Sequence, residues 1–221
     1  MYHDDMKAVI FDLDGTLLDT LDDIKSAINY ARKAYDGEPI SSEDARRYIG
    51  NGLFKALKRS FDEHGPEVAE DEFALIFQLM MEYYRKHPAD HARPYDGVME
   101  LLYGLKEKGI KCAILSNKAD SIVQDIAKIS FGDFTFDYVL GHREDFPLKP
   151  DPESVKHVLS VLGVEKDDIL YVGDSEVDYK TAMSIGARHI IVTYGFRDRV
   201  DLEKLPGAVL MDRVPSLEDI L

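Results

Sequence analysis

The sequence predicts an α/β fold in which a doubly wound parallel sheet carries an inserted small helical cap domain. Short apolar runs rich in strand-forming residues recur along the chain, and helical patterns lie between the later runs. Continuous apolar runs of this length are typical of strands buried on both faces, as in a parallel sheet. One long interval after the first run contains no convincing strand pattern, which indicates an insertion.

Six apolar runs are expected to form the strands of the core. They are "KAVIFDLD" from Lys7, "KCAILSN" from Lys111, "FDYVLG" from Phe136, "ILYVGDS" from Ile169, "HIIVTYG" from His189 and "AVLM" from Ala208. The segment after the third run has clear helix signals, because Asp151 can cap a helix, Pro152 suits its first turn and Gly163 suits its end. Strands that alternate with such helices predict a Rossmann-like sheet.

The interval between residues 18 and 93 has helical periodicity instead. Apolar residues keep helical spacing from Ile24 to Tyr35, and a long amphipathic segment from Glu67 ends before Pro88. We expect a Rossmann-like catalytic core formed by residues 1–17 and 94–221, and a helical cap formed by residues 18–93.

Composition limits the classes of partner. The 221 residues include 42 acidic and 27 basic side chains, a formal net charge of −15, which disfavours nonspecific binding to nucleic acid or to an anionic membrane. A small phosphorylated metabolite remains possible if its pocket is locally positive. Cys112, the single cysteine, lies in an apolar run, so a buried thiol is expected. Without a signal-like or membrane-spanning stretch, we expect a soluble cytoplasmic protein; the oligomeric state is not predicted.

Polar side chains follow three of the predicted strands. Ligands of open parallel sheets bind beyond the carboxyl ends of the strands, so these side chains are expected at one edge of the sheet. They are Asp12 and Asp14 after the first strand, Ser116 and Asn117 after the second, and Asp174 after the fourth.

The acidic residues at this edge suggest a metal site. Asp174 and Asp178 lie four residues apart at the start of a predicted helix, where like charges repel, although acids also favour helix N-termini. With Asp12 and Asp14 nearby, four carboxylates would repel strongly without a cation or shifted pKa values. All the candidate ligands are oxygens, which favours Mg²⁺ over zinc.

Lys149 and Ser116 supply groups that the carboxylates lack. An ammonium and a hydroxyl can hold phosphoryl oxygens. Taken alone, a lysine is usually solvated and a serine after a strand often caps a helix. The order acid pair, serine, lysine, acid pair indicates phosphoryl chemistry more strongly than any of its members.

This order of motifs resembles the haloacid dehalogenase superfamily, in its Mg²⁺-dependent phosphatase branch. The stretches "DLDGT", "LSN", the lysine of "PLKPDP" and "GDSEVD" match the four motifs of the family over the whole core, and the helical interval matches its small cap. The resemblance implies hydrolysis of a small phosphomonoester through an aspartyl-phosphate intermediate. A dehalogenase would lack the second acid, Asp14.

The resemblance also implies roles for individual residues. Asp12 is expected to be the nucleophile, and Asp14 the acid that protonates the leaving oxygen and then activates water. The expected Mg²⁺ ligands are Asp12, the backbone carbonyl of Asp14 and Asp174, with Asp178 in a supporting position. The residues expected to bind the phosphoryl group are Ser116, Asn117 and Lys149.

The cap stretch "RRYIGNGL", residues 46–53, resembles the substrate loop of phosphoglycolate phosphatases, as "VTYGF" from Val192 resembles another of their segments. It implies that Arg47, Gly50 and Asn51 approach a small anion, with 2-phosphoglycolate as the substrate best indicated. In the alternative interpretation the stretch is a turn between helices, in which the glycines serve geometry.

Other functions share parts of this pattern. Pyrophosphatases and nucleotidases of the same family carry similar loops, and phosphosugar mutases use the same core. A non-catalytic receiver-like module, which accepts a phosphoryl group, also has an acid pair, a hydroxyl and a lysine. Receivers, however, carry the acceptor aspartate on a later strand and lack a helical insertion after the first, and "FDYVLG" has no aspartate at its end.

Overall fold

The chain forms two compact units in the computed structural model, which describes residues 6–50 and 52–221. The larger unit contains the chain up to Asp19 and Pro94–Leu221, and the smaller unit is Thr20–Arg93. Residues 18 and 19, which the sequence analysis assigned to the insertion, therefore lie in the larger unit. They form strand β2 (Leu18–Asp19), which pairs with β3 (Arg93–Pro94). These strands were not predicted, because two residues are too few to show a periodicity.

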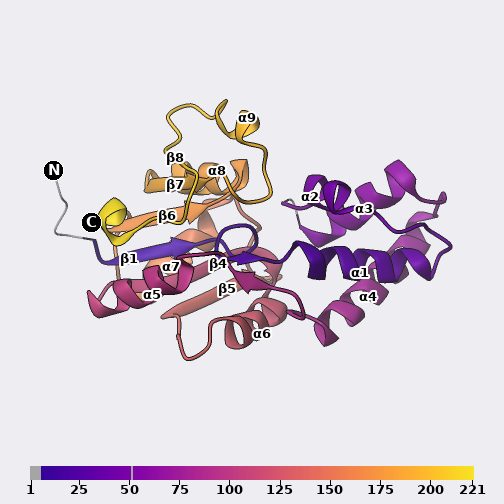
Figure 1. Ribbon diagram of the computed structural model, residues 1–221, viewed down its shortest axis with the longest axis horizontal. Coiled ribbons are helices and arrows are strands. Elements are labelled where there is room, and N and C mark those ends of the chain that lie inside the picture. The colour runs from indigo at the N-terminus through magenta and orange to yellow at the C-terminus, as the bar shows by residue number, and fades with distance from the viewer. Residues whose placement is uncertain (1–5, 51) are drawn as a thin grey trace. The chain divides into compact units, whose positions relative to one another are not determined.

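The larger unit is built on a six-stranded sheet in the order β5-β4-β1-β6-β7-β8, with every described pairing parallel (Figure 1). Its strands are β1 (Ala8–Phe11), β4 (Lys111–Ala119), β5 (Tyr138–His142), β6 (Ile169–Gly173), β7 (Arg188–Val192) and β8 (Leu210–Met211). All six predicted runs contribute a strand, and the predicted fold class is confirmed. The strand order reverses at β1, and such a switch point is where open α/β sheets bind ligands.

Helices connect the strands of this sheet, and the last helix follows β8. They are α5 (Val98–Glu107), α6 (Asp120–Ser130), α7 (Pro152–Leu162), α8 (Glu176–Ile185), α9 (Arg199–Leu202) and α10 (Leu217–Ile220), with a 3-10 turn at Lys166–Asp168. The Asp151 side chain caps α7 and Gly163 ends it in the left-handed conformation, as predicted. Helices α7 and α8 cover the sheet face that carries Ala8 and Ile10. Because parallel connections are right-handed, α5 and α6 belong to the opposite face.

The register of the central strands positions the candidate site. Phe11, the last residue of β1, lies beside Ile114 of β4 and Val172 of β6. Asp12 follows Phe11 directly, and its backbone N–H donates to the Val172 carbonyl oxygen at 2.9 Å. The residues that follow β1, β6 and the regular part of β4 therefore meet at one edge.

The smaller unit consists of helices α1 (Leu21–Lys33), α2 (Ser42–Tyr48), α3 (Leu53–His64) and α4 (Glu70–Lys86). Its most deeply buried charged side chain is that of Arg32, which is fully enclosed. The guanidinium donates to the carbonyl oxygens of Glu38 at 2.7 Å and His64 at 2.8 Å, and also to that of Ser60. The His64 carbonyl group lies at the C-terminal end of α3, where carbonyl groups lack partners within the helix, so Arg32 supplies its donor.

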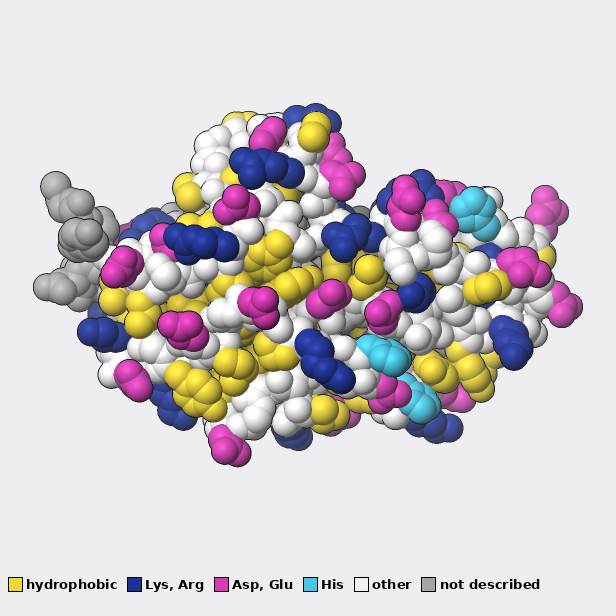
Figure 2. Space-filling model, in the orientation of Figure 1, with side chains coloured by type: hydrophobic (Ala, Val, Ile, Leu, Met, Phe, Trp, Pro, Cys, Tyr) yellow, Lys and Arg dark blue, Asp and Glu magenta, His cyan; other side chains and the backbone are white. Residues whose placement is uncertain are grey.

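Three properties expected from the composition can be compared with the structure: the surface charges, the presence or absence of a membrane-spanning helix and the single cysteine. On the face drawn in Figure 2, acidic and basic side chains are interspersed. Among the described residues no helix has the length and apolar character needed to cross a membrane. Cys112 is buried as predicted, and burial together with the Asp137 carboxylate raises the pKa of its thiol to about 12.

We expect Arg32→Ala to lower the free energy of unfolding by roughly 2–4 kcal/mol, because it leaves carbonyl groups inside the helical unit without a donor. Urea unfolding of the full chain, followed by circular dichroism, measures the change. Arg85→Ala is the matched control: Arg85 is exposed on α4, and its loss should change stability by less than about 0.5 kcal/mol. Equal effects of the two substitutions would contradict the role given to Arg32.

Candidate active site

Asp12 lies directly after β1, and one of its carboxylate oxygens takes part in both a hydrogen bond and an ion pair. Its Oδ1 accepts a hydrogen bond from the Leu13 backbone N–H at 2.8 Å and lies 2.9 Å from the Lys149 Nζ. The Lys149 side chain is only 3% exposed, so its charge is compensated by neighbouring groups rather than by water. The structure thus joins the predicted first and third motifs in one ion pair.

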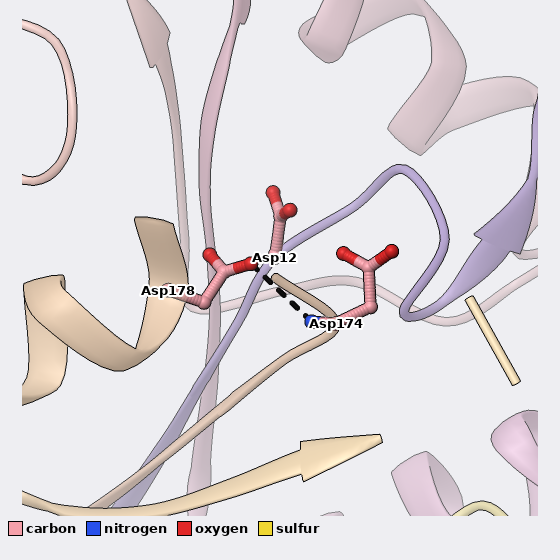
Figure 3. A group of neighbouring side chains, drawn as sticks. All are labelled: Asp12, Asp174 and Asp178. Atoms are coloured by element: carbon pink, nitrogen blue, oxygen red, sulfur yellow. Dashed lines mark hydrogen bonds between the residues drawn. The ribbon is translucent and has the colours of Figure 1, made fainter. Parts of the chain in front are cut away.

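Three carboxylates gather at this edge of the sheet, as Figure 3 shows for Asp12, Asp174 and Asp178. Each offers an oxygen, and these oxygens lie within 4.8 Å of one another. Asp174 follows β6, and its Oδ2 accepts a hydrogen bond from the Phe196 backbone N–H at 2.7 Å. The cluster is the only group of three or more potential metal-ligating side chains found among the residues that the structure describes.

Asp178 is the most completely bonded of the three. Its Oδ2 accepts from the Ser175 hydroxyl at 2.6 Å in a capping box at the start of α8. Its Oδ1 accepts from the Lys149 Nζ at 2.8 Å and from the Tyr171 hydroxyl at 3.2 Å. Both of its oxygens are therefore engaged within the protein. Asp178 fixes the turn after β6 and at the same time orients Lys149.

The pKa values reflect the crowding of negative charge. Burial and the Asp178 carboxylate raise the pKa of Asp12 to about 7, against the lowering effect of Lys149. Burial, followed by the charges of Asp178 and Asp12, raises the pKa of Asp174 well above its usual value. Burial lowers the pKa of Lys149, but Asp12 and Asp178 outweigh it and hold that pKa well above its usual range. One lysine thus does not balance the cluster, and a divalent cation would relieve the repulsion.

Two glycines make room for Asp174. A Cβ on Gly15, whose φ is 81°, would lie 2.3 Å from the Asp174 Oδ2, and a Cβ on Gly195 would lie equally close. Any larger residue would displace this carboxylate. The glycine of "DLDGT" is therefore required by the approach of Asp174 as well as by the left-handed turn.

Ser116 and Asn117 lie where the pairing of β4 with β5 shifts register, between Leu115 and Ala119. Such irregularities are common beside active sites, because they redirect side chains. Ser116 is buried, and its hydroxyl accepts from the Lys118 backbone N–H at 3.2 Å.

The Asn117 side chain holds the backbone of Lys149 on both sides. Its Oδ1 accepts from the Lys149 N–H at 2.7 Å, and its Nδ2 donates to the Lys149 carbonyl oxygen at 3.1 Å. The sequence analysis placed Asn117 among the phosphate-binding residues. Both ends of its side-chain amide are engaged in positioning the lysine, and a contact of Asn117 with phosphate stays a prediction.

Lys118 was missed by the sequence analysis. Its Nζ lies 2.5 Å from the Asp14 Oδ1, and its side chain is 1% exposed. A lysine after an apolar strand looks like a solvated residue, which is why it did not stand out. The available signal was its spacing, because residues two apart on a strand share a face and Ser116 is two residues earlier.

The predicted cap residues belong to the other unit. Arg47 on α2 is exposed, and its Nη2 lies 2.7 Å from the Asp44 Oδ1 and 2.9 Å from the Glu63 Oε2. The connection between α2 and α3 contains Gly50 with a φ of 118°, a value that favours glycine and fits the interpretation of a turn. Asn51 lies outside the described residues.

Comparison with known proteins decides the family. Residues 9–192 match the family described as haloacid dehalogenase-like hydrolase. The chain belongs to this family. Among curated relatives of this hydrolase, the phosphoglycolate phosphatase of Thiobacillus denitrificans is 36% identical over 222 residues, covering 97% of this chain and 93% of the relative. Phosphoglycolate phosphatase 1 of Pseudomonas aeruginosa is 32% identical over 221 residues, covering 97% and 78% respectively.

A solved structure agrees with these relatives. The crystal structure of a predicted phosphoglycolate phosphatase from Haemophilus somnus superimposes with a TM-score of 0.86 at 30% identity, covering 96% of each chain. The resemblance seen in the sequence is therefore confirmed, and this haloacid dehalogenase-like hydrolase is an enzyme of the phosphoric monoester hydrolase class. A non-catalytic receiver-like module, the alternative of a different class, does not agree with this family.

We expect Asn117→Ala to lower kcat/KM for phosphomonoesters by about 10- to 100-fold, because misplacement of a catalytic group by about 1 Å costs up to this much. Steady-state kinetics measures the change. Gln124→Ala is a matched control, since the Gln124 amide likewise donates to a backbone carbonyl, that of Val139, at 2.8 Å. The control should keep its activity. Wild-type kcat/KM in Asn117→Ala would show that Lys149 does not need this support.

Proposed function

We propose that the chain is a Mg²⁺-dependent phosphatase that hydrolyses a small phosphomonoester through an aspartyl-phosphate intermediate on Asp12. The substrate that we propose is 2-phosphoglycolate. The observation that carries the proposal is the meeting of three buried carboxylates with the ammonium of Lys149 at the switch point of the sheet. The substrate rests on the relatives named phosphoglycolate phosphatase.

The donor set fits a hard divalent cation. All the candidate ligands are oxygens, and the three clustered carboxylates repel one another. This crowding contributes to the raised pKa values of Asp12 and Asp174, and a cation would balance the charge. Asp12, Asp174 and the backbone carbonyl of Asp14 would hold the ion, with Asp178 in support. When bound, it would offset negative charge on the phosphoryl oxygens.

The reaction would proceed in two steps on residues of this site. In the first, an oxygen of Asp12 attacks phosphorus as the bond to the leaving oxygen breaks, while Asp14 gives that oxygen a proton. In the second, Asp14 takes a proton from water, whose oxygen attacks phosphorus and displaces Asp12, so that phosphate is released. Lys149, 2.9 Å from the nucleophile, would balance charge on the phosphoryl group, and the Ser116 hydroxyl would donate to it.

The second anionic group of 2-phosphoglycolate needs a partner of its own. We assign it to the loop of residues 46–53, through Arg47 and the backbone amides around Gly50 and Asn51. Arg47 is paired with two carboxylates, so its participation would require an exchange of those partners.

Binding of Mg²⁺ should be visible without any substrate. We expect excess Mg²⁺ to raise the Tm of the chain by about 5 °C or more over EDTA, because an ion that binds only the folded state stabilises it. Asp174→Asn should abolish this shift. Asp125→Asn, a change of an exposed carboxylate on α6, should retain it. An equal shift in all three proteins would mean that Mg²⁺ acts elsewhere on the chain.

Kinetics on a panel of substrates tests the reaction and the substrate together. The panel contains 2-phosphoglycolate, pyrophosphate, a nucleoside monophosphate, phosphosugars and 4-nitrophenyl phosphate, each with and without Mg²⁺. We expect the highest kcat/KM for 2-phosphoglycolate by tenfold or more, about 1.4 kcal/mol in transition-state binding. Asp12→Asn should abolish turnover of every member, because an amide is a poor nucleophile.

Each outcome of the panel has a distinct meaning. Preference for pyrophosphate or a nucleotide would replace the substrate, and isomerisation of a phosphosugar would indicate a mutase. Wild-type turnover by a folded Asp12→Asn protein would overturn the covalent mechanism.

A further inference from the structure

We propose that Lys118 is a positioning residue for the Asp14 carboxyl group, and that it holds this group for proton transfer to the leaving oxygen. The inference rests on the proposed function, because it assigns a task within phosphoryl transfer. It extends that function by giving each lysine of the site its own task. Lys149 acts on the nucleophile and the phosphoryl group, and Lys118 acts on the proton transfer.

The contact itself is short and enclosed. The Lys118 Nζ lies 2.5 Å from the Asp14 Oδ1, with the two side chains 1% and 15% exposed. Burying an ammonium in this way contributes little to stability, since an apolar residue of similar volume often stabilises a fold as well or better. The burial of a charge at this position is therefore better explained by a function in the site.

The two lysines have separate partners. Lys149 pairs with Asp12 and Asp178, at 2.9 Å and 2.8 Å, whereas Lys118 pairs with Asp14. The charge of Lys149 is thus directed at the nucleophile and the phosphoryl position. The charge of Lys118 is directed at the residue that handles the proton.

Asp14 is fixed from both its backbone and its side chain. Its backbone forms a β-bridge with Leu18, and the next residue, Gly15, donates its N–H to the Leu18 carbonyl oxygen at 2.9 Å. Lys118 reaches the side chain from a different segment, the irregular end of β4. Without Lys118 the backbone bridge would remain, but the direction of the carboxyl group would be less constrained.

The proton balance explains why this direction matters. In the first step the Asp14 O–H bond breaks, its proton goes to the leaving oxygen as the P–O bond breaks, and its electron pair stays on the carboxylate. The ammonium attracts the charge that remains and keeps the carboxylate in place for the second step, in which it accepts a proton from water. Lys118 itself gains and loses no proton. Its contribution to the first step, which kcat/KM reports, is therefore confined to leaving groups that need protonation.

A double-mutant cycle tests this assignment. Wild type, Lys118→Met, Asp14→Asn and the double variant are compared on the best alkyl phosphate of the panel and on 4-nitrophenyl phosphate, whose leaving group needs no proton. We expect Lys118→Met to lower kcat/KM by about 100-fold or more on the alkyl phosphate and by less than about tenfold on the aryl phosphate. In the Asp14→Asn background, Lys118→Met should cost less than about threefold, because it acts through Asp14.

Two further variants serve as references. Lys118→Arg keeps the positive charge and should recover part of the activity on the alkyl phosphate. Lys111→Met makes the same substitution at the other end of β4, where the Lys111 Nζ donates to the Leu162 carbonyl oxygen at 2.6 Å, and should leave both rates unchanged. Circular dichroism checks folding, and Lys118→Gln replaces Lys118→Met, under the same criteria, if the latter does not fold.

The outcomes separate this inference from the function on which it rests. Equal losses on the two substrates, or a full loss retained in the Asp14→Asn background, would overturn the inference, since Lys118 would then contact the phosphoryl group or the leaving group directly. A wild-type protein that hydrolyses neither phosphomonoester would overturn the proposed function itself.

Discussion

The ion triplet of Asp12, Lys149 and Asp178 is the interaction on which the geometry of this site depends. One ammonium, 3% exposed, lies 2.9 Å and 2.8 Å from two carboxylates, that of Asp12 directly after β1 and that of Asp178 in the first turn of α8. Buried like charges repel unless a counter-charge stands between them. Lys149 supplies that charge, and Asn117 fixes its backbone by two hydrogen bonds. The parts of the catalytic edge therefore constrain one another.

The site contains more negative charge than its lysines offset. The repulsion between these buried carboxylates lowers the stability of the fold. Asp12 and Asp174 have raised pKa values because they are buried near other carboxylates. The surrounding structure reduces this cost with local devices. The Phe196 N–H donates to Asp174, and glycines allow the backbone to approach it. The remaining imbalance is what a divalent cation would remove, and it is therefore informative about function.

The helical unit is organised around a different buried charge. Arg32 is fully enclosed, and its guanidinium ties the end of α1 to carbonyl groups of α3 and of the turn at Glu38. Its partners are backbone groups, whereas those of Lys149 include two carboxylates. The first arrangement supplies a donor to the His64 carbonyl group, which the end of α3 leaves without a partner. The second holds acidic side chains together at the candidate active site, so the buried cation pairs with backbone carbonyls in one unit and with carboxylates in the other.

The sequence by itself determined the six core strands, the helical insertion and the family, because these depend on local periodicity and on motifs whose order survives in one dimension. It also singled out Asp12, Lys149 and Asp174, whose gathering followed from the rule that parallel strands end at one edge. Only the tertiary structure decided what each side chain contacts. Asn117 bonds to the Lys149 backbone, and Lys118 meets Asp14 across 104 positions of the chain. Contacts between residues so far apart in sequence depend on strand order, on register and on the irregular end of β4. Local sequence patterns do not predict these three features.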